Sequence, residues 1–210
     1  MTAMRRVVVY PDRIAVEAAD VPAPGPNEAL VRTLVAGVCG SDLHAAHGRH
    51  PFVPLPYRPG HEVVGVIEAV GAAAGAWTPG QRVIVEPDLP CWTCKMCTTG
   101  RENLCENLQF FGCGYAQGGM ADYFTLPANR LHSVPDALDD NTAALIEPLS
   151  TPVHAARLAA TWPTGPSPSS EPAPSACSPW RCSAHTAPER SSAPIRTWPS
   201  ASGPRPSAPT

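Results

Sequence analysis

The feature that most limits what this chain can fold into is an abrupt change of composition after Leu158. Residues 161–210 contain 12 Pro and 11 Ser but only one Ile, and they contain no Val, Leu, Phe or Tyr. Such a segment cannot bury enough apolar surface to offset an ordering cost of roughly 1–2 kcal/mol per residue. The sequence therefore predicts a folded core within residues 1–158 and a disordered tail over residues 161–210.

Charge and hydropathy exclude several classes of function. The formal net charge is −3 and the isoelectric point is near 6.1, so the chain shows no excess of positive charge for nucleic acid. No stretch approaches the roughly 20 apolar residues of a membrane span, and the apolar run after Arg6 is too short for the core of a signal peptide. We therefore expect a cytoplasmic protein with no nucleic-acid or membrane partner. Its eight cysteines then indicate metal binding rather than disulfides.

Short β-branched segments separated by Gly and Pro turns predict a mostly β domain of the α+β class over residues 1–150. The expected strands lie within residues 5–10, 13–19, 28–40, 60–71, 81–87 and 118–127. Three short helices are also expected. Ser41 or Asp42 would cap a helix ending at His47, Asp139 or Asp140 would cap one ending at Glu147, and Thr151 would cap one that starts at Pro152.

Four cysteines form a C-x2-C-x2-C-x7-C array within a lobe over residues 88–110: Cys91, Cys94, Cys97 and Cys105. Four thiolates close a tetrahedral shell around Zn²⁺ and leave no open position, so a zinc bound here would be structural. Ferredoxins also use the C-x2-C-x2-C spacing, which makes a four-cysteine iron–sulfur cluster the main competitor. Free buried cysteines are the remaining interpretation, and the regular spacing argues against it.

Three further motifs are spread along the chain: "GVCGSDLH" at 37–44, "GHEVVG" at 60–65 and "IEPLS" at 146–150. With the cysteine array, and in this order, they make residues 5–158 resemble the GroES-like catalytic domain of zinc-dependent medium-chain alcohol and polyol dehydrogenases. The sorbitol, threonine and glucose dehydrogenase branches are included in that resemblance. One departure is Gln81 in "GQRV", where the family usually has "GDRV"; it is a turn position.

The resemblance implies a catalytic zinc in addition to the structural one. Cys39 and His61 match two ligands of the catalytic zinc. Glu62 matches a carboxylate that ligates zinc in several branches, and Glu147 matches the glutamate that ligates zinc or holds its water in the polyol-type branch. A catalytic zinc has three protein ligands and an open position, and the sequence leaves both glutamates open as the third ligand.

Around these ligands, the resemblance implies that Ser41 takes the proton of the alcohol and that His44 passes it toward solvent. It also implies that Asp42 orients the zinc-bound histidine. The residues alone admit a plainer interpretation, with Ser41 and Asp42 as helix caps and His44 on the surface. Zinc lowers the pKa of a bound hydroxyl group, and the hydride then goes to a nicotinamide, because no side chain accepts hydride.

The family also implies a Rossmann α/β domain, whose G-x-G-x-x-G turn is expected soon after residue 158 but is absent from residues 159–210. When the last base of each codon is read with the first two bases of the next, the junctions after Ser170, Pro172 and Ser175 all permit Gly at the spacing of that turn. We therefore interpret residues 151–160 as the start of the helix that leads to the Rossmann domain. Residues 161–210 would be a frameshifted remnant of that domain. A natural Pro/Ser-rich tail is the alternative, and the coding DNA distinguishes the two.

The sequence thus predicts the catalytic domain of a zinc-dependent dehydrogenase of a small alcohol or polyol. NAD or NADP is the cofactor expected for the family, with its site missing from the chain as written, so we expect little or no turnover. The intact family also implies a homo-oligomer. The alternative is a zinc-binding module without enzyme activity. The zinc-free quinone reductase branch of the same fold is a poor match, because it lacks the cysteine lobe.

Overall fold

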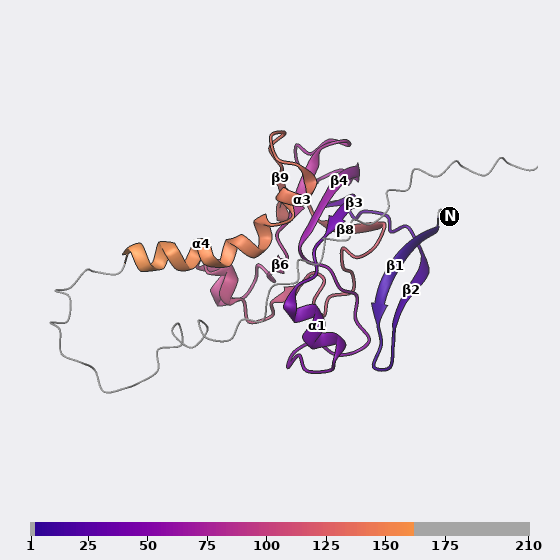
Figure 1. Cartoon of the computed structure of the whole chain (residues 1–210). Helices are drawn as coiled ribbons and strands as arrows, with labels where there is room; N and C mark the ends of the chain where they lie inside the picture. The colour runs from indigo at the N-terminus through magenta and orange to yellow at the C-terminus, as the bar shows by residue number, and fades with distance from the viewer. Residues whose placement is uncertain (1–2, 162–210) are drawn as a thin grey trace, which may run out of the picture.

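A five-stranded antiparallel sheet forms the centre of the structure, a computed structural model that describes residues 3–161 (Figure 1). The strand order is β8-β3-β4-β5-β9. The strands are β3 (Glu28–Ala36), β4 (Val63–Val70), β5 (Arg82–Val85), β8 (Tyr123–Pro127) and β9 (Leu131–Ser133). All strand pairs in the described part of the chain are antiparallel, and the predicted mostly β, α+β fold class is confirmed.

The central strands β3 and β4 are apolar on both sides because each face of the sheet has its own core. Phe111, Phe124 and Leu126 are completely buried on one face, where they pack with Val31 and Val63. On the other face, a second cluster contains Val35, Val64, Val134, Ala143 and Ala144. This double burial explains why residues 63–67 read as a continuous apolar run instead of an alternating pattern.

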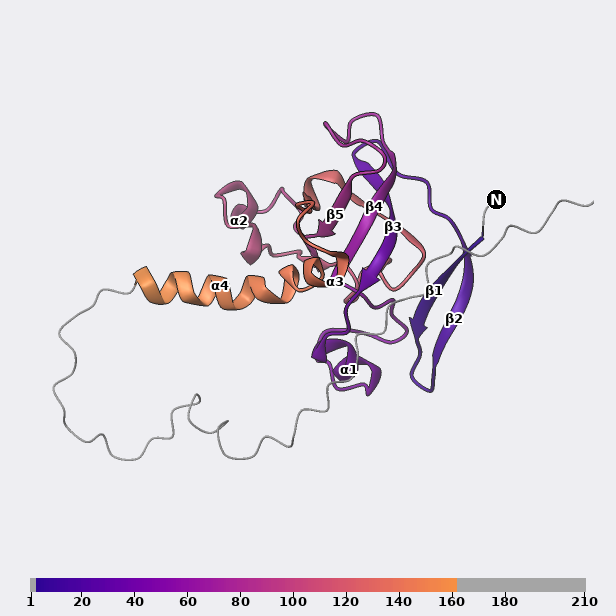
Figure 2. The ribbon, with the colours of Figure 1, turned by 45° about the horizontal axis from the view of Figure 1, so that its top comes forward.

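Two smaller hairpins flank the sheet (Figure 2). Strands β1 (Ala3–Val9) and β2 (Ile14–Asp20) form the first, which joins the rest of the fold through β-bridges from Arg6 to Ala121 and from Val9 to Tyr57. The two-residue strands β6 (Asp88–Leu89) and β7 (Gln109–Phe110) form the second. Between β6 and β7 lie the helix α2 (Lys95–Thr98) and the 3-10 helix η1 (Glu102–Leu104); a second 3-10 helix, η2 (Ala128–Arg130), precedes β9.

Helix α1 (Gly40–Ala46) follows β3, and its N-cap is Cys39. The caps expected at Ser41 and Asp42 are therefore wrong. Asp42 is the third residue of the helix, and its Oδ2 accepts a hydrogen bond of 3.0 Å from the backbone N–H of Cys39. This is the reciprocal arrangement of a capping box, which starts the helix three residues before the acidic side chain.

The C-terminal helices also differ from the expectation. Asp139 caps α3 (Asp140–Ala143), as one of the two alternatives predicted, but α4 is a single helix over Ile146–Thr161. The break expected at Pro148 and the new start at Thr151 are wrong. Pro148 lies in the first turn of α4, where a backbone N–H has no intrahelical partner to lose. Pro152 falls in the exposed part of the helix, where water can reach the carbonyl that it leaves without a donor.

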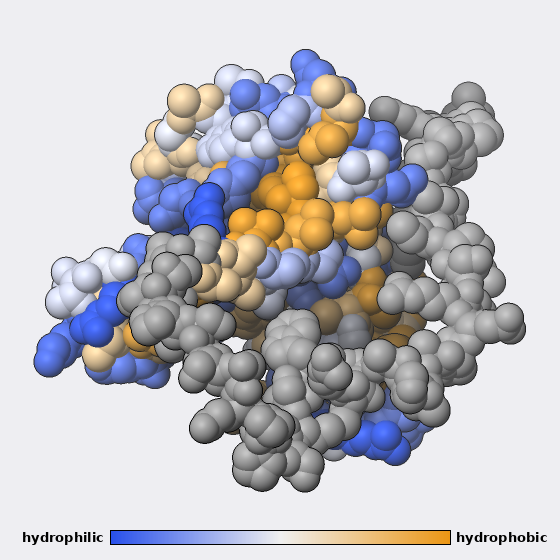
Figure 3. Space-filling model, turned by 60° about the vertical axis from the view of Figure 1, so that its left-hand side comes forward, coloured by the Kyte–Doolittle hydropathy of each residue, from blue (hydrophilic) through white to orange (hydrophobic). Residues whose placement is uncertain are grey.

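Helix α4 projects away from the sheet, and its residues from Pro148 to Ala159 are exposed (Figures 1 and 2). Leu145, Leu149 and Val153 follow one another at intervals of four and expose 48%, 54% and 51% of their surface. Figure 3 shows apolar side chains gathered in the middle of the face that this view brings forward. Among the described residues, no helix has the length and apolar character that crossing a membrane requires. The interpretation of residues 162–210 as a frameshifted tail lies outside the described residues.

Candidate functional site

The structure brings Cys39, His61 and Glu62 together. The Cys39 Sγ, a ring nitrogen of His61 and a carboxylate oxygen of Glu62 all lie within 4.8 Å of one another. Cys39 sits at the N-terminus of α1, while His61 and Glu62 directly precede β4. Residues far apart in the sequence therefore meet where β3 ends and β4 begins.

Close backbone packing fixes the two residues before β4. Gly60 has a φ of +106°, and a Cβ there would lie 2.9 Å from Cγ of Met120 and also overlap its backbone. The Gly60 carbonyl accepts a hydrogen bond of 2.8 Å from the Gly119 N–H. On the other side, the Gly37 N–H donates to the Glu62 carbonyl at 2.7 Å, and the Glu62 side chain passes over Gly37. Glycine is needed at both contacts, because any side chain would fill the space that the neighbouring segment occupies.

Asp42 lies beneath the cluster and is almost fully buried, with 6% exposure. Besides the bond from Cys39, the Tyr57 hydroxyl donates to its backbone carbonyl at 3.2 Å and lies 3.4 Å from Oδ1. Burial raises the pKa of Asp42, against the opposing effects of the hydrogen bond from Cys39 and the charge of His61. Asp42 thus links Tyr57 and Cys39 through hydrogen bonds, and it interacts electrostatically with His61.

His61 has the environment expected of a metal ligand. Its side chain is 4% exposed, and its Nδ1 is buried without a hydrogen-bond partner. The edge of its ring faces Phe110, with the ring centroids 5.4 Å apart at an interplanar angle of 74°. An unpaired buried nitrogen beside a thiol and a carboxylate fits a zinc ion, for which these are ordinary ligands.

Glu147 lies near this cluster but is not part of the group within 4.8 Å. It is half-buried at the start of α4, and burial raises its pKa. The nearby His61 lowers that pKa, while Glu62 and Asp88 raise it further. The structure thus places both candidate glutamates beside His61, with Glu62 the one that joins Cys39 and His61.

A cavity of about 510 Å³ opens on the His61 side of the cluster. Ser41 lines it, whereas the His44 side chain is exposed on α1 and is not among the lining residues. The rest of the wall carries no sequence motif that points to a site. It includes His50, Phe52, Val53, Leu108, Gln109, Phe110 and Cys113. Leu108–Phe110 form the C-terminal end of the cysteine lobe, and their nearness in sequence to Cys105 was the available signal.

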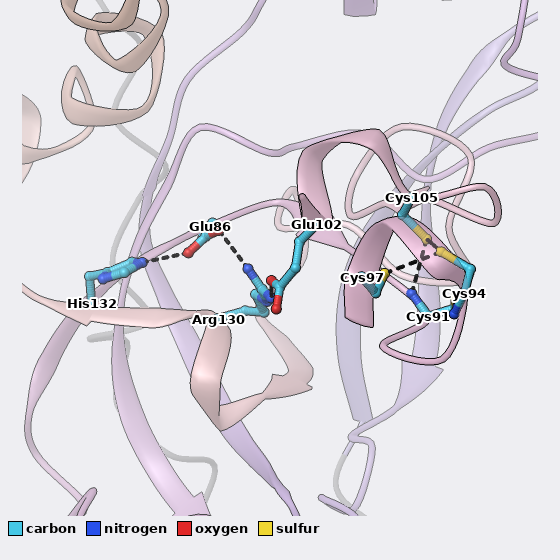
Figure 4. Close-up of polar contacts among 8 residues, drawn as sticks. All are labelled: Glu86, Cys91, Cys94, Cys97, Glu102, Cys105, Arg130 and His132. Atoms are coloured by element: carbon cyan, nitrogen blue, oxygen red, sulfur yellow. Dashed lines mark hydrogen bonds and ion pairs between the residues drawn. The ribbon is translucent and has the colours of Figure 1, made fainter. Parts of the chain in front are cut away.

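The four cysteines of the array form a second cluster, with all four Sγ atoms within 4.8 Å of one another (Figure 4). The Sγ atom of Cys94 lies 3.5 Å from that of Cys97 and 4.0 Å from that of Cys105. A tetrahedron with zinc–sulfur bonds of about 2.3 Å places its sulfurs about 3.8 Å apart, so the spacing fits a metal and not a disulfide.

Backbone N–H groups point at the sulfurs of this cluster. The Cys94 N–H donates to the Cys91 Sγ at 3.3 Å, and the Cys91 N–H donates to the Cys105 Sγ at 3.2 Å. Hydrogen bonds from Thr93, together with that from Cys94, lower the pKa of Cys91 to about 5. Donors of this kind favour the thiolate, which is the form that binds metal.

The sequence of this chain is similar to those of known proteins. Residues 25–136 match the family model "Alcohol dehydrogenase GroES-like domain". Sorbitol dehydrogenase of Bacillus subtilis is 38% identical over 157 residues, which cover 73% of this chain and 44% of that protein. L-galactonate-5-dehydrogenase of Escherichia coli K12 is 40% identical over 145 residues, 69% of this chain and 42% of that protein.

Solved structures agree with these matches. The alcohol dehydrogenase of Escherichia coli CFT073 complexed with NADH resembles this chain with a TM-score of 0.66 at 32% identity, covering 71% of this chain and 44% of that one. This chain therefore spans less than half the length of each of these three proteins.

Proposed function

The chain belongs to the family of zinc-dependent alcohol and polyol dehydrogenases, and from that premise we propose that residues 3–161 bind the alcohol and hold the catalytic zinc. The observation that supports this most directly is the meeting of Cys39, His61 and Glu62 beside a cavity of about 510 Å³, which His61 lines. We propose these three residues as the protein ligands of the metal. Glu147, from α4, is the alternative third ligand.

Zinc held there would act as a Lewis acid that lowers the pKa of an alcohol in the cavity. The residues around it would then handle the proton. Ser41, on the cavity wall, accepts it from the substrate hydroxyl, and His44, three residues further along α1 and exposed, releases it to solvent. Asp42 keeps Cys39 and His61 in position through its hydrogen bond to the Cys39 N–H and its buried charge.

We propose a structural role for the four-cysteine lobe, over residues 88–110, with one zinc bound by Cys91, Cys94, Cys97 and Cys105. The spacing of the sulfurs and the N–H groups directed at them support a metal–thiolate site. Measurement of zinc and iron in the purified full chain distinguishes a zinc site from an iron–sulfur cluster.

Metal analysis of three variants tests both sites. We expect two zinc ions in the 210-residue chain, and one each in Cys39→Ser and Cys97→Ser. Cys113→Ser is the matched control, because Cys113 belongs to neither group of ligands, and it should retain both. Equal zinc content in the wild type and Cys39→Ser would contradict the catalytic site without affecting the structural one.

The hydride acceptor in this family is a nicotinamide, and we propose NAD or NADP for the reaction of this domain. All strand pairs within residues 3–161 are antiparallel, so these residues contain no parallel sheet of the kind that carries a dinucleotide. We therefore propose that this chain turns over slowly or not at all with NAD and NADP. A dehydrogenase assay on sorbitol and threonine tests this; robust turnover would refute it. Zinc binding without nucleotide binding would favour a non-catalytic zinc-binding module.

We also propose a cytoplasmic location for this chain and a homo-oligomeric state for the intact enzymes of the family.

A further inference from the structure

The cysteine lobe begins with strand β6 and ends with strand β7, and β7 forms part of the cavity wall. Asp88 pairs with Phe110, and Leu89 pairs with Gln109, so the chain leaves the sheet after Leu89 and returns to it at Gln109. Gln109 and Phe110 line the cavity, and Phe110 packs edge-on against His61. The position of the lobe therefore determines where the strand beside His61 lies.

Arg130, from η2, connects the lobe to the sheet (Figure 4). One guanidinium nitrogen binds Glu86, just after β5, at 2.6 Å, and another binds Glu102 of the lobe. The guanidinium carbon also lies 5.3 Å from the centroid of the Trp92 ring, between the first two cysteines. Arg130 thus contacts the lobe at two points far apart in its sequence.

The arginine of this connection is buried, and the charged groups that face it are all acidic. The Arg130 side chain is only 8% exposed, and its cationic group is faced by the carboxylates of Glu86 and Glu102, with that of Asp88 also nearby. His132, on β9, holds the other Glu86 oxygen at 2.8 Å. Without the arginine, the carboxylates on the lobe and on the sheet would repel each other across a partly buried space.

Leu89 anchors the start of the lobe in the main core, but apolar packing is incomplete around Trp92. A second cavity of about 850 Å³ lies between Trp92 of the lobe and a wall that includes Trp77, Ala128 and Asn129. The lobe is therefore not closely packed against the sheet on this side, and the position of the lobe depends on a few polar contacts.

We propose that Arg130 is a positioning residue for the substrate cavity: by fixing the cysteine lobe to the sheet, it holds Gln109 and Phe110 beside His61. The metal in the lobe serves the same purpose, since it keeps Trp92 and Glu102 in the arrangement that Arg130 contacts. The lobe then determines the shape of the cavity through its last residues, Leu108–Phe110, although none of its four cysteines lines the cavity. This inference rests on the proposed function in taking the cavity as the substrate site.

The test compares Arg130→Met with Arg82→Met in the zinc-loaded full chain. Arg82 is a matched control, since its partly buried guanidinium binds Asp140 and two carbonyls far from the lobe. In Arg130→Met we expect the amides of Gln109–Phe111 to exchange with deuterium about tenfold faster or more, and the His61 ring resonances to shift as Phe110 moves. Arg82→Met should change neither, and Arg130→Lys, which keeps the charge but not the fork, should give an intermediate effect.

If Arg130→Met fails to fold, Glu102→Gln removes the ion pair between Arg130 and the lobe but keeps the contact with Trp92, and it should shift the same His61 resonances by a smaller amount. Unchanged His61 resonances in both variants, or equal changes in Arg82→Met, would overturn the proposal. The zinc content of the wild type is measured in parallel. A chain without zinc at Cys39 would refute the proposed function, while the exchange rates would still report on the connection through Arg130.

Discussion

Gly37 shows how a single position without a side chain can determine a metal site. A Cβ at Gly37 would overlap the Glu62 carboxylate and lie 2.9 Å from its Cβ, whereas a Cβ at Gly40 would meet nothing within 4 Å. We expect Gly37→Ala to displace Glu62 and to lower the zinc affinity of the Cys39 site by about 10–100-fold, with Gly40→Ala as the control. Competition with a chromophoric chelator measures this; equal affinities in the two variants would show that Glu62 is not a ligand.

Tyr57 supports the same site through the hydrogen bond from its hydroxyl to Asp42. Tyr57→Phe keeps the buried ring but removes the hydroxyl that donates to Asp42, so we expect a loss of about 0.5–1.5 kcal/mol in unfolding free energy. Because Asp42 also holds the Cys39 N–H, the zinc affinity should fall as well. Urea unfolding and zinc titration measure the two effects. Tyr115→Phe, at another partly buried tyrosine, should leave zinc affinity unchanged.

The sequence motifs predicted the residues that carry the chemistry better than those that shape the cavity. Cys39, His61 and Glu62 could be predicted because they match the ligand positions in the motifs of the family that the chain resembles, and the structure brings them together. Phe110 and Cys113 could not, because an aromatic or a lone thiol has no such signature. Their place on the cavity wall follows from the path of the chain after the lobe. Whether these ligands bind zinc remains a prediction.

At the scale of elements, the longer strands could be predicted from the sequence, whereas the boundaries of the helices could not. Strands β1, β3, β4 and β5 fall within or close to the expected segments, because β-branched runs of four residues or more carry a clear pattern. The two-residue strands β6 and β7 have no period to detect. The sequence does not reveal the start of α4, because a proline in the first turn of a helix cannot be told by pattern from a proline that ends a helix.

The cap of α3 gives a test of helix energetics with a defined pH dependence. Asp139 accepts hydrogen bonds from the Thr142 hydroxyl at 2.7 Å and from its N–H at 2.9 Å, and these lower the pKa of Asp139. A lowered pKa means that the ionised cap stabilises the fold above the unfolded-state pKa of about 3.9, and that this stability is lost as the pH falls through the folded-state value.

We therefore expect Asp139→Ala to lower the melting temperature by roughly 2–4 °C at pH 7 and by less near pH 3. Thermal unfolding followed by circular dichroism at several pH values measures this. Asp136→Ala, at an exposed position just before the cap, is the control. A loss that is the same at both pH values would show that the charge of Asp139 contributes nothing.

At the scale of the whole molecule, the fold consists of a well-packed sheet with two partly independent attachments. The sheet has complete cores on both faces, whereas the cysteine lobe contains a candidate metal site and contacts Arg130, and α4 extends into solvent. The cysteine spacing predicts such a lobe, and its dependence on metal stays a prediction. The sequence does not indicate how the lobe is attached, because Glu86, Glu102 and Arg130 are ordinary charged residues until the fold brings them together.

This division predicts how the molecule responds to loss of metal. Zinc bound at 100 times its Kd adds about 2.7 kcal/mol per site to the free energy of unfolding. A strong chelator should therefore lower the stability of the full chain in two steps, one for each zinc site. Loss at the cysteine lobe should increase deuterium exchange over residues 88–110 while the amides of β3 and β4 stay protected, because their core does not include the cluster. Cys97→Ser should show this pattern before any chelator is added, and Cys39→Ser should show it only afterwards. Loss of protection in β4 at the same chelator concentration as in the lobe would mean that the lobe and the sheet unfold as one unit.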